Sequence, residues 1–354
     1  MIFDRFDRYI ARNVLAAMLV VQVMILGLDL VISYINDLDD VEGNYGALDV
    51  FVYLLMRLPW RFYQYAPVGV LIGALIGLGS MASSNELTVM RASGRSLARI
   101  LWGAMKPLGL VIILTMAISE WVSPVTEQHA EAWRLEQLEG EGAILSERGG
   151  WQREGNDYYR FGTIRADDVV IDITRYHFEG TQMVSAEHAD RAVWENGSWQ
   201  WQNIEETRFE DGRTVVDTTD KRTWDTSFTP AQLNRLLRPL DSQSPSDLWR
   251  YASYLDNQGL EATQPLLYFW QKMLLPFTLA GLMLVAASFV FGPLRTVAAG
   301  TRVFYGIIVG VSFKYLQDLL APASMLFGFS PVFAVLVPTV ACYVLGIVLL
   351  RRTG

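Results

Sequence analysis

Charged side chains within apolar stretches are the first candidates for chemistry in this sequence, because a charge inside a bilayer costs several kcal/mol unless it is paired or hydrated. Lys314 and Asp318 lie four residues apart in one apolar run, so they can face each other on one side of a helix. Two interpretations are open: a mutual ion pair that lets the helix insert, or a polar spot that faces a partner subunit or a translocation path. Asp29 is isolated in another run, about two turns from an acidic end, where it can reach hydrated headgroups.

A second group of candidates is the pair Arg57 and Arg61, four residues apart just before an apolar run, with Pro59 between them. A guanidinium group can hold a phosphate with two parallel hydrogen bonds. The same long side chains can instead extend to lipid headgroups. Both functions stay open at this point.

Residues 83–94 read Ser-Ser-Asn-Glu-Leu-Thr-Val-Met-Arg-Ala-Ser-Gly and predict a short amphipathic helix. Ser84 or Asn85 can cap its start, and Gly94 can end it. The residues expected to share one face are Leu87, Met90 and Arg91. Such a helix serves either as an interfacial connector between membrane helices or as a projection that enters the groove of a cytoplasmic ATPase.

Signatures of catalysis are missing from the sequence. A Walker A loop needs a glycine before its lysine, and none of the four lysines follows a glycine. The three histidines lack the spacing of a zinc site, and there is no Gly-x-Ser-x-Gly motif. The single cysteine, Cys342, excludes an intrachain disulfide. We therefore expect no catalytic residues, no metal and no cofactor, and any energy must come from another subunit.

The candidate residues must be positioned by helices that cross a membrane. Six apolar runs, each near the roughly 20 residues that a bilayer core requires, lie three before and three after a polar insert. The runs are residues 14–35, 62–81, 101–118, 269–291, 303–320 and 332–350. In the second run Gly69, Gly73 and Gly77 recur every fourth residue, which predicts close packing against another helix.

Charge divides the chain into two parts with different expected surroundings. Residues 127–261 hold 26 acidic and 14 basic side chains, whereas the remainder holds 11 acidic and 15 basic ones. An acidic insert excludes nucleic-acid binding, which needs a basic face. Because loops rich in Lys and Arg stay in the cytoplasm, the arginines near both termini and in the loop at residues 91–99 predict cytoplasmic termini, with the insert on the other side.

The insert has the pattern of short strands between about residues 150 and 225. Residues 168–178 alternate polar and apolar, and Asn196-Gly197 and Asp211-Gly212 are typical of tight hairpins. Glu179-Gly180 and Gly155-Asn156 predict two further turns. These signals predict an antiparallel sandwich or an open jelly roll. Helices are expected over residues 126–138 and 245–258, so that the third and fourth membrane helices continue as connectors to the insert. Five tryptophans are expected in core and hairpin packing rather than in a ligand cage: Trp151, Trp194, Trp199, Trp201 and Trp224. An open edge or cleft would suit an acyl chain or an added strand from a partner.

Several motifs together carry a family resemblance over essentially the whole chain. They are Asp7-Arg8-Tyr9-Ile10, residues 71–79 and 86–94, Glu120-Trp121-Val122-Ser123-Pro124, and residues 288–295, Ser-Phe-Val-Phe-Gly-Pro-Leu-Arg. With these the chain resembles the YjgP/YjgQ permeases, the F- and G-type membrane subunits of the lipopolysaccharide exporter of Gram-negative bacteria. The G-type members are the more similar ones.

The resemblance implies an α+β membrane protein of six transmembrane helices (3+3) with an inserted periplasmic antiparallel β jelly-roll domain. It implies membrane domains at residues 1–125 and 263–354 around a periplasmic domain at residues 126–262, in the bacterial inner membrane. Implied partners are a sister F-type permease, a dimeric cytoplasmic ATPase that binds the ATP, and a single-helix periplasmic linker protein. The complex would extract lipopolysaccharide and deliver it to a periplasmic bridge.

By the same resemblance Glu86 matches the acidic residue of a coupling helix near residues 84–95, which contacts the ATPase. Arg134 matches a basic residue near the lipid phosphates, and Asp318 an aspartate of the fifth, gate-forming helix. This chain departs from G-type relatives at Ser33, Asp39 and Asp40, where lysines can occur. We therefore expect the lipid phosphates at the three arginines, Arg57, Arg61 and Arg134.

Three alternatives stay open. The chain could be a non-transporting permease that relays ATPase motion to a periplasmic partner, which needs the coupling helix but no lipid-sized cavity. It could be a membrane enzyme acting on lipid or peptidoglycan, for which acid, base and metal clusters are lacking. It could also be the F-type partner.

Overall fold

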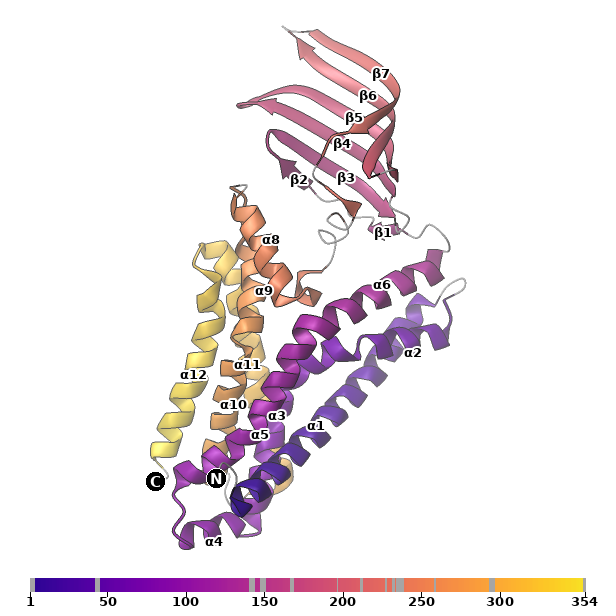
Figure 1. The fold of residues 1–354 in the computed structure, drawn as a ribbon. Coiled ribbons are helices and arrows are strands. Elements are labelled where there is room, and N and C mark those ends of the chain that lie inside the picture. The colour runs from indigo at the N-terminus through magenta and orange to yellow at the C-terminus, as the bar shows by residue number, and fades with distance from the viewer. Residues whose placement is uncertain are drawn as a thin grey trace.

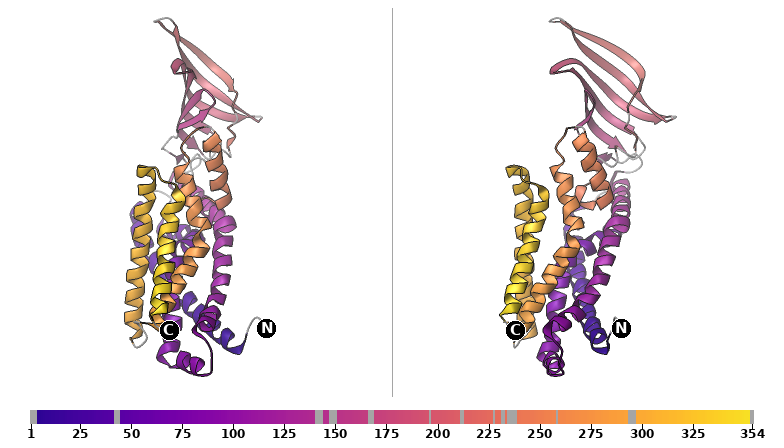
Figure 2. Two further views of the ribbon diagram at one scale, coloured as in Figure 1. Left: turned by 90° about the vertical axis from the view of Figure 1, so that its left-hand side faces the viewer. Right: turned by 60° about the vertical axis from the view of Figure 1, so that its left-hand side comes forward.

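The computed structural model divides the chain into a helical bundle and a β-sheet beyond one end of it (Figure 1, Figure 2). It describes residues 4–41, 45–139, 144–146, 151–165, 169–195, 197–210, 213–226, 228–230, 233, 239–257, 259–292 and 297–352. Both termini and α4 (Glu86–Ala92) lie at the end of the bundle opposite the sheet (Figure 1). The predicted class, an α+β membrane protein with an antiparallel sheet inserted between two sets of helices, is confirmed.

The helices before the sheet supply three candidate membrane spans. They are α1 (Arg5–Asp37), α2 (Ala47–Met56), α3 (Leu58–Ser83) and α5 (Leu97–Ala117), which continues through a π-turn (Ile118–Val122) into α6 (Ser123–Glu139). α1, α3 and the joined helix α5–α6 are long and apolar enough to cross a bilayer, whereas α2 is too short. The predicted helix at residues 126–138 is confirmed, and it continues the third span as expected.

The helices after the sheet supply the remaining candidate membrane spans. They are α8 (Pro245–Asn257), α9 (Thr263–Met273), α10 (Leu275–Phe291), α11 (Ala299–Phe327) and α12 (Pro331–Arg351). Across the described residues five helices qualify as spans alone, and α9 with α10, bent by 52°, makes the sixth. The predicted helix at residues 245–258 is confirmed as α8. It does not continue into the fourth span as expected, because Gly259 (φ +67°) ends it in a left-handed cap.

Two helix breaks share one cause. α3 follows α2 after Arg57, and α10 follows α9 after Leu274; each new helix has a proline, Pro59 or Pro276, at its second position. A proline has no N–H for the preceding turn and disfavours helical backbone in the residue before it. The fourth predicted run, residues 269–291, therefore lies on two helices bent by 52° rather than on one.

The glycine stripe of α3 packs against α1, as predicted. A Cβ added to Gly73 would lie 2.5 Å from Cα of Met18, and one added to Gly77 would lie 2.9 Å from Cα of Val14. Only glycine permits this backbone approach. Because α1 and α3 lie so close, side chains of one helix can reach polar groups of the other.

The sheet is wholly antiparallel. Its strands are β1 (Ile144–Ser146), β2 (Trp151–Glu154), β3 (Asp157–Arg165), β4 (Val169–Glu179), β5 (Gln182–Glu195), β6 (Ser198–Glu210) and β7 (Arg213–Trp224). The order is β1-β3-β4-β5-β6-β7, and β2 also pairs with β3. Gly155, Gly180 and Gly197 have positive φ in the connecting turns, as predicted, whereas Asn196, Asp211 and Gly212 lie outside the described residues.

One face of the sheet carries an aromatic core. Trp199, Trp201 and Trp224 are buried there, so the expectation that they pack rather than form a cage is confirmed. Nε1 of Trp224 donates to the hydroxyl of Tyr159 (3.3 Å), and burial raises the pKa of Tyr159 to about 12. Trp194 packs against this core, whereas Trp151 is 60% exposed and packs outside it, against Tyr176 of β4.

Candidate functional site

The break between α2 and α3 positions Arg57 at the sheet end of the bundle. Its Nε donates to Oε2 of Glu127 on α6 (3.0 Å), and its guanidinium lies over the rings of Tyr53 and Trp60 at 5.3 and 5.2 Å. Glu127 is 5% exposed. The Arg57 side chain is therefore held by a buried carboxylate and two aromatic rings.

Arg134 reaches the same cluster from α6. Its guanidinium lies 5.0 Å from the ring centroid of Tyr53, and its Nη2 donates to Oδ2 of Asp40 (2.6 Å). The hydroxyl of Tyr53 donates to Glu131 (2.6 Å) and accepts from Nη1 of Arg57 (2.9 Å). Tyr53 thus joins two of the three predicted phosphate-binding arginines.

Sequence reasoning missed Tyr53, Glu127 and Glu131. A signal for them existed, since Tyr53 stands four residues before Arg57 and the two glutamates share one face of the predicted helix at residues 126–138.

Arg61 lies one turn further along α3, where it forms an ion pair with Asp29 of α1. Its Nη1 also donates to Oγ of Ser33 (2.7 Å), and the hydroxyl of Tyr65 donates to Oδ1 of Asp29 (2.6 Å). The expectation that Asp29 is isolated is therefore wrong. The pattern of one helix does not reveal a partner on the neighbouring helix, which the glycine stripe brings close.

Two exposed tryptophans indicate where the apolar slab lies along the third span. Trp102 on α5 is 67% exposed and Trp121 in the π-turn is 71% exposed. They are 19 residues apart. At a rise of 1.5 Å per residue this spans about 28 Å, close to the thickness of a bilayer core, and tryptophans favour its two interfaces. Glu127 and Arg134 lie beyond Trp121 along the helix. The arginine cluster, formed by Arg57 and Arg134 around Tyr53, therefore belongs to the interface nearer the sheet.

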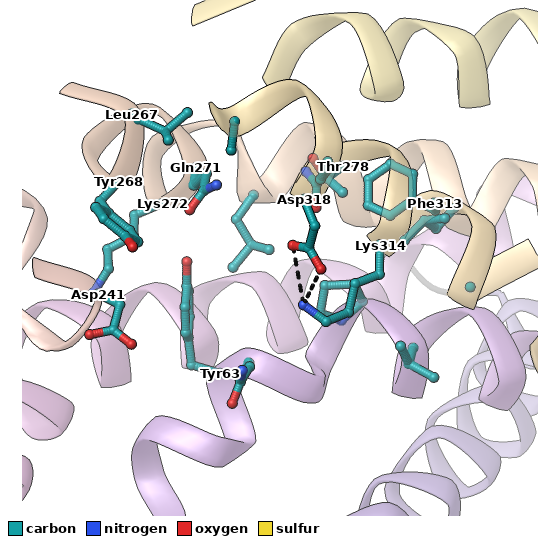
Figure 3. Close-up of a pocket in the computed structure, with 18 of the residues that line it drawn as sticks. Tyr63, Asp241, Leu267, Tyr268, Gln271, Lys272, Thr278, Phe313, Lys314 and Asp318 are labelled. Atoms are coloured by element: carbon teal, nitrogen blue, oxygen red, sulfur yellow. Dashed lines mark hydrogen bonds and ion pairs between the residues drawn. The ribbon is translucent and has the colours of Figure 1, made fainter. Parts of the chain in front are cut away.

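A cavity of about 500 Å³ opens among α3, α9, α10 and α11 (Figure 3). Lys314 and Asp318 of α11 line it and form the predicted ion pair, with Nζ 3.0 Å from Oδ2. Their side chains are 62% and 54% exposed, so the pair is open to the cavity rather than buried between helices. Its role as a polar spot toward a partner or a path stays a prediction.

Lys272 of α9 lines the other end of the same cavity, near Asp241 (Figure 3). It is 2% exposed, its Nζ donates to the carbonyl of Gln243 (2.6 Å), and it lies 5.3 Å from the ring centroid of Tyr63. A buried lysine needs such partners. It ties the segment that returns from the sheet to the bent fourth span, a role that no local sequence pattern indicated.

The predicted coupling helix is α4, at the end of the bundle opposite the sheet. Leu87 and Met90 are buried in the bundle core, whereas Arg91 is exposed. The three lie on one side of the helix, as their spacing predicts, but the bundle covers only Leu87 and Met90, and Arg91 lies at the exposed edge of that side. Gly94 (φ +88°) ends the helix as predicted, and Oε1 of Glu86 accepts from Oγ of Ser84 (2.9 Å).

A buried ion cluster fixes the loop after α4 to the start of α1. Asp7 is 4% exposed and accepts from Nζ of Lys106 (2.6 Å) and from Nη1 of Arg95 (3.2 Å). Arg95 also pairs with Asp4 and lies 4.5 Å from the ring centroid of Phe6. Any movement of the loop is thereby transmitted to α1 and α5.

Known proteins resemble the chain over its full length. The family model described as lipopolysaccharide export system permease LptF/LptG matches residues 8–352. Lipopolysaccharide export system permease protein LptG of Escherichia coli strain K12 is 31% identical over 355 residues, which cover 99% of each chain. The protein of the same name from Haemophilus influenzae is 32% identical over 339 residues, 94% of each chain. The chain therefore belongs to the LptF/LptG family of lipopolysaccharide export system permeases.

Proposed function

We propose that this chain is the G-type permease subunit of an ATP-driven transporter that extracts lipopolysaccharide from the inner membrane and delivers it to a periplasmic bridge. The observation that carries the proposal is the match to two proteins named LptG along 94% and 99% of their length. The match includes both sets of helices and the sheet.

Energy for the extraction must come from outside the chain. Each CH₂ group moved from lipid to water costs about 0.8 kcal/mol, so an amphiphile with several acyl chains does not leave the bilayer at a useful rate. Without a Walker A loop, this chain needs a separate cytoplasmic ATPase. α4 suits that contact, because Val89 (66% exposed) and Arg91 are both exposed on this helix, which begins at Glu86.

The faces of α1 and α11 suit the lipid and the sister permease. On α1 the exposed apolar residues include Leu19, Val20, Val23, Met24, Leu28 and Val31. On α11 they include Phe304, Ile308, Val311, Tyr315 and Leu319. A lateral gate between the first helix of one permease and the fifth of the other would cover these faces on closing and expose them to lipid on opening. The periplasmic linker protein would join the assembly at its sheet end.

The test is reconstitution of this chain with a sister permease and an ATPase in vesicles that contain lipopolysaccharide. We expect ATP-dependent release of lipopolysaccharide to a soluble acceptor, and loss of ATPase co-purification for Glu86→Ala. The cost is about 2–5 kcal/mol of binding free energy if the Glu86 contact is desolvated, and under about 1 kcal/mol if it is exposed. Unchanged release and unchanged co-purification for Glu86→Ala would remove the coupling assignment.

One observation favours the mechanical alternative, a permease that relays ATPase motion without carrying lipid. All three arginines expected at the phosphates are already paired with carboxylates. Photocrosslinkers at Leu28 and Tyr315, on the faces of α1 and α11, separate the two functions. Crosslinks to lipopolysaccharide at both positions support transport, and their absence in an assembly that still hydrolyses ATP supports the mechanical relay.

A further inference from the structure

The sheet has a second aromatic cluster, on the face opposite its core. Arg153 of β2 stands opposite Tyr158 of β3, which stands opposite Tyr176 of β4. Because side chains alternate along a strand, these residues share a face with Trp151 and Phe178, whereas Tyr159 and Phe161 turn to the core. This second cluster adds nothing to the buried core that stabilises the domain.

The cluster lines a groove of about 600 Å³, called the aromatic groove below. Trp151 stacks on Tyr176 with ring centroids 5.6 Å apart and an interplanar angle of 25°. Tyr158 meets Phe178 edge to face at 5.3 Å. Such contacts hold the rings in fixed orientations, and the 60% exposure of Trp151 leaves an indole surface open at the groove.

Polar groups form the rim of the groove. The turn at Asn156 and the turn at Gly180-Thr181 both contribute, and the amide of Phe178 donates to the carbonyl of Asn156 (3.0 Å), which holds the two turns together. Nε of Arg153 donates to the carbonyl of Gly155 (2.9 Å), and its guanidinium lies 5.2 Å from the ring centroid of Tyr158. The rim thus offers an amide, a hydroxyl and a guanidinium in set positions.

This combination of an open indole surface and a polar rim fits a sugar. A pyranose ring presents a flat patch of C–H groups that stacks on an aromatic face, while its hydroxyls exchange hydrogen bonds with amide, hydroxyl and guanidinium groups. An acyl chain has no hydroxyl groups, so it would make no use of the polar rim.

The position of the aromatic groove also suits a sugar that projects from the membrane. β2 lies at the side of the sheet nearest α8 (Figure 1), and the hydroxyl of Tyr254 on α8 donates to the carbonyl of Arg153 (3.3 Å). The groove therefore lies near the interface marked by Trp121, on the side where the saccharide of a membrane lipid projects from the bilayer. We propose that it binds the oligosaccharide part of lipopolysaccharide, an inference that rests on the proposed function.

The test uses the full chain in detergent and a lipid-free core oligosaccharide as the probe, with binding measured by calorimetry. Wild-type protein is expected to bind, and Trp151→Ala to weaken the affinity by about tenfold, as loss of one aromatic stacking surface predicts. Trp151→Phe keeps a ring and should lose less. Phe209→Ala is the matched control, because Phe209 is 41% exposed on the same sheet and does not line the groove.

Four outcomes overturn the proposal: no binding by wild type, full binding by Trp151→Ala, equal loss in Phe209→Ala, or displacement of the probe by a fatty acid. Photocrosslinking of the same preparations to intact lipopolysaccharide separates the two proposals. If intact lipopolysaccharide binds and the oligosaccharide does not, the aromatic groove is not a sugar site and the proposed function stands. If neither binds, the proposed function fails as well.

Discussion

Each arginine expected at the lipid phosphates has a carboxylate partner, and the partners differ in exposure. The side chain of Glu127, the partner of Arg57, is 6% exposed, whereas that of Asp40, the partner of Arg134, is 49% exposed. A phosphate can displace an exposed carboxylate at little cost, since an exposed ion pair contributes under about 1 kcal/mol. Arg134 is therefore the arginine most accessible to an anionic lipid.

Removing the charge of Asp40 tests whether Arg134 is the arginine most accessible to the lipid. We expect Asp40→Asn to increase lipopolysaccharide crosslinking about two- to fivefold, because Arg134 no longer has to leave a carboxylate. Asp39→Asn is the control, since it removes the same charge one residue away and no described ion pair involves Asp39. An equal gain in both variants would mean that general repulsion, not release of Arg134, limits binding.

The pair of Arg61 and Asp29 makes a contrasting prediction about stability. Their side chains are 10% and 16% exposed, so removal of one partner leaves the other charge buried. We expect Asp29→Ala to lower the free energy of unfolding in detergent by about 3–5 kcal/mol, and the double variant Asp29→Ala with Arg61→Met to lose less. Additive losses in the double variant would show that the pair does not interact.

At the scale of elements, sequence patterns predicted what depends on local periodicity. The six runs, the strands, the turns at Gly155 and Gly180 and the pair of Lys314 with Asp318 all depend on spacing within one segment, and the structure contains them. Partners on different helices, such as Arg61 for Asp29, depend on which helices pack together. Spacing along one segment carries no such information.

The bend in the fourth span was missed although a signal was present. Pro276 could have indicated the bend between α9 and α10, since a proline disturbs the turn before it. The inward face of α4 depends on how much of a seven-residue helix the bundle covers, which required the structure.

The buried cluster at Asp7 joins the loop after α4 to α1. This link gives a prediction about how ATP hydrolysis is coupled to lipopolysaccharide release. Asp7→Asn leaves Arg95 and Lys106 without their shared carboxylate, so the loop after α4 loosens from α1. We expect the ATPase to bind and to hydrolyse ATP, while lipopolysaccharide release per ATP falls at least about fivefold, equivalent to about 1 kcal/mol of lost coupling.

The control for Asp7→Asn is Asp4→Asn. Asp4 also pairs with Arg95, but its side chain is 44% exposed, so its loss should leave release nearly unchanged. Loss of ATPase binding in Asp7→Asn would show instead that the cluster builds the docking surface itself.

At the scale of the whole molecule, one continuous helix connects its two ends. From Leu97, just after the α4 loop, to Arg134 the joined helix runs for 38 residues, about 57 Å at 1.5 Å per residue. Glu120 in its π-turn contacts Ser246 at the start of α8, where Oγ of Ser246 donates to Oε1 of Glu120 (2.5 Å). A displacement near α4 can therefore reach both the arginine cluster and the base of the sheet.

This connection has functional meaning only if the two ends lie on opposite sides of the membrane, and the single cysteine makes that easy to test. Replacing Cys342 with Ala gives a background for single cysteines at Ser93, beside α4, and at Thr218 on β7, both of which are exposed. A membrane-impermeant maleimide should label Thr218→Cys in spheroplasts and Ser93→Cys only after the membrane is permeabilised. The reverse pattern would place the arginine-rich end outside, and the proposed coupling to a cytoplasmic ATPase would then be wrong.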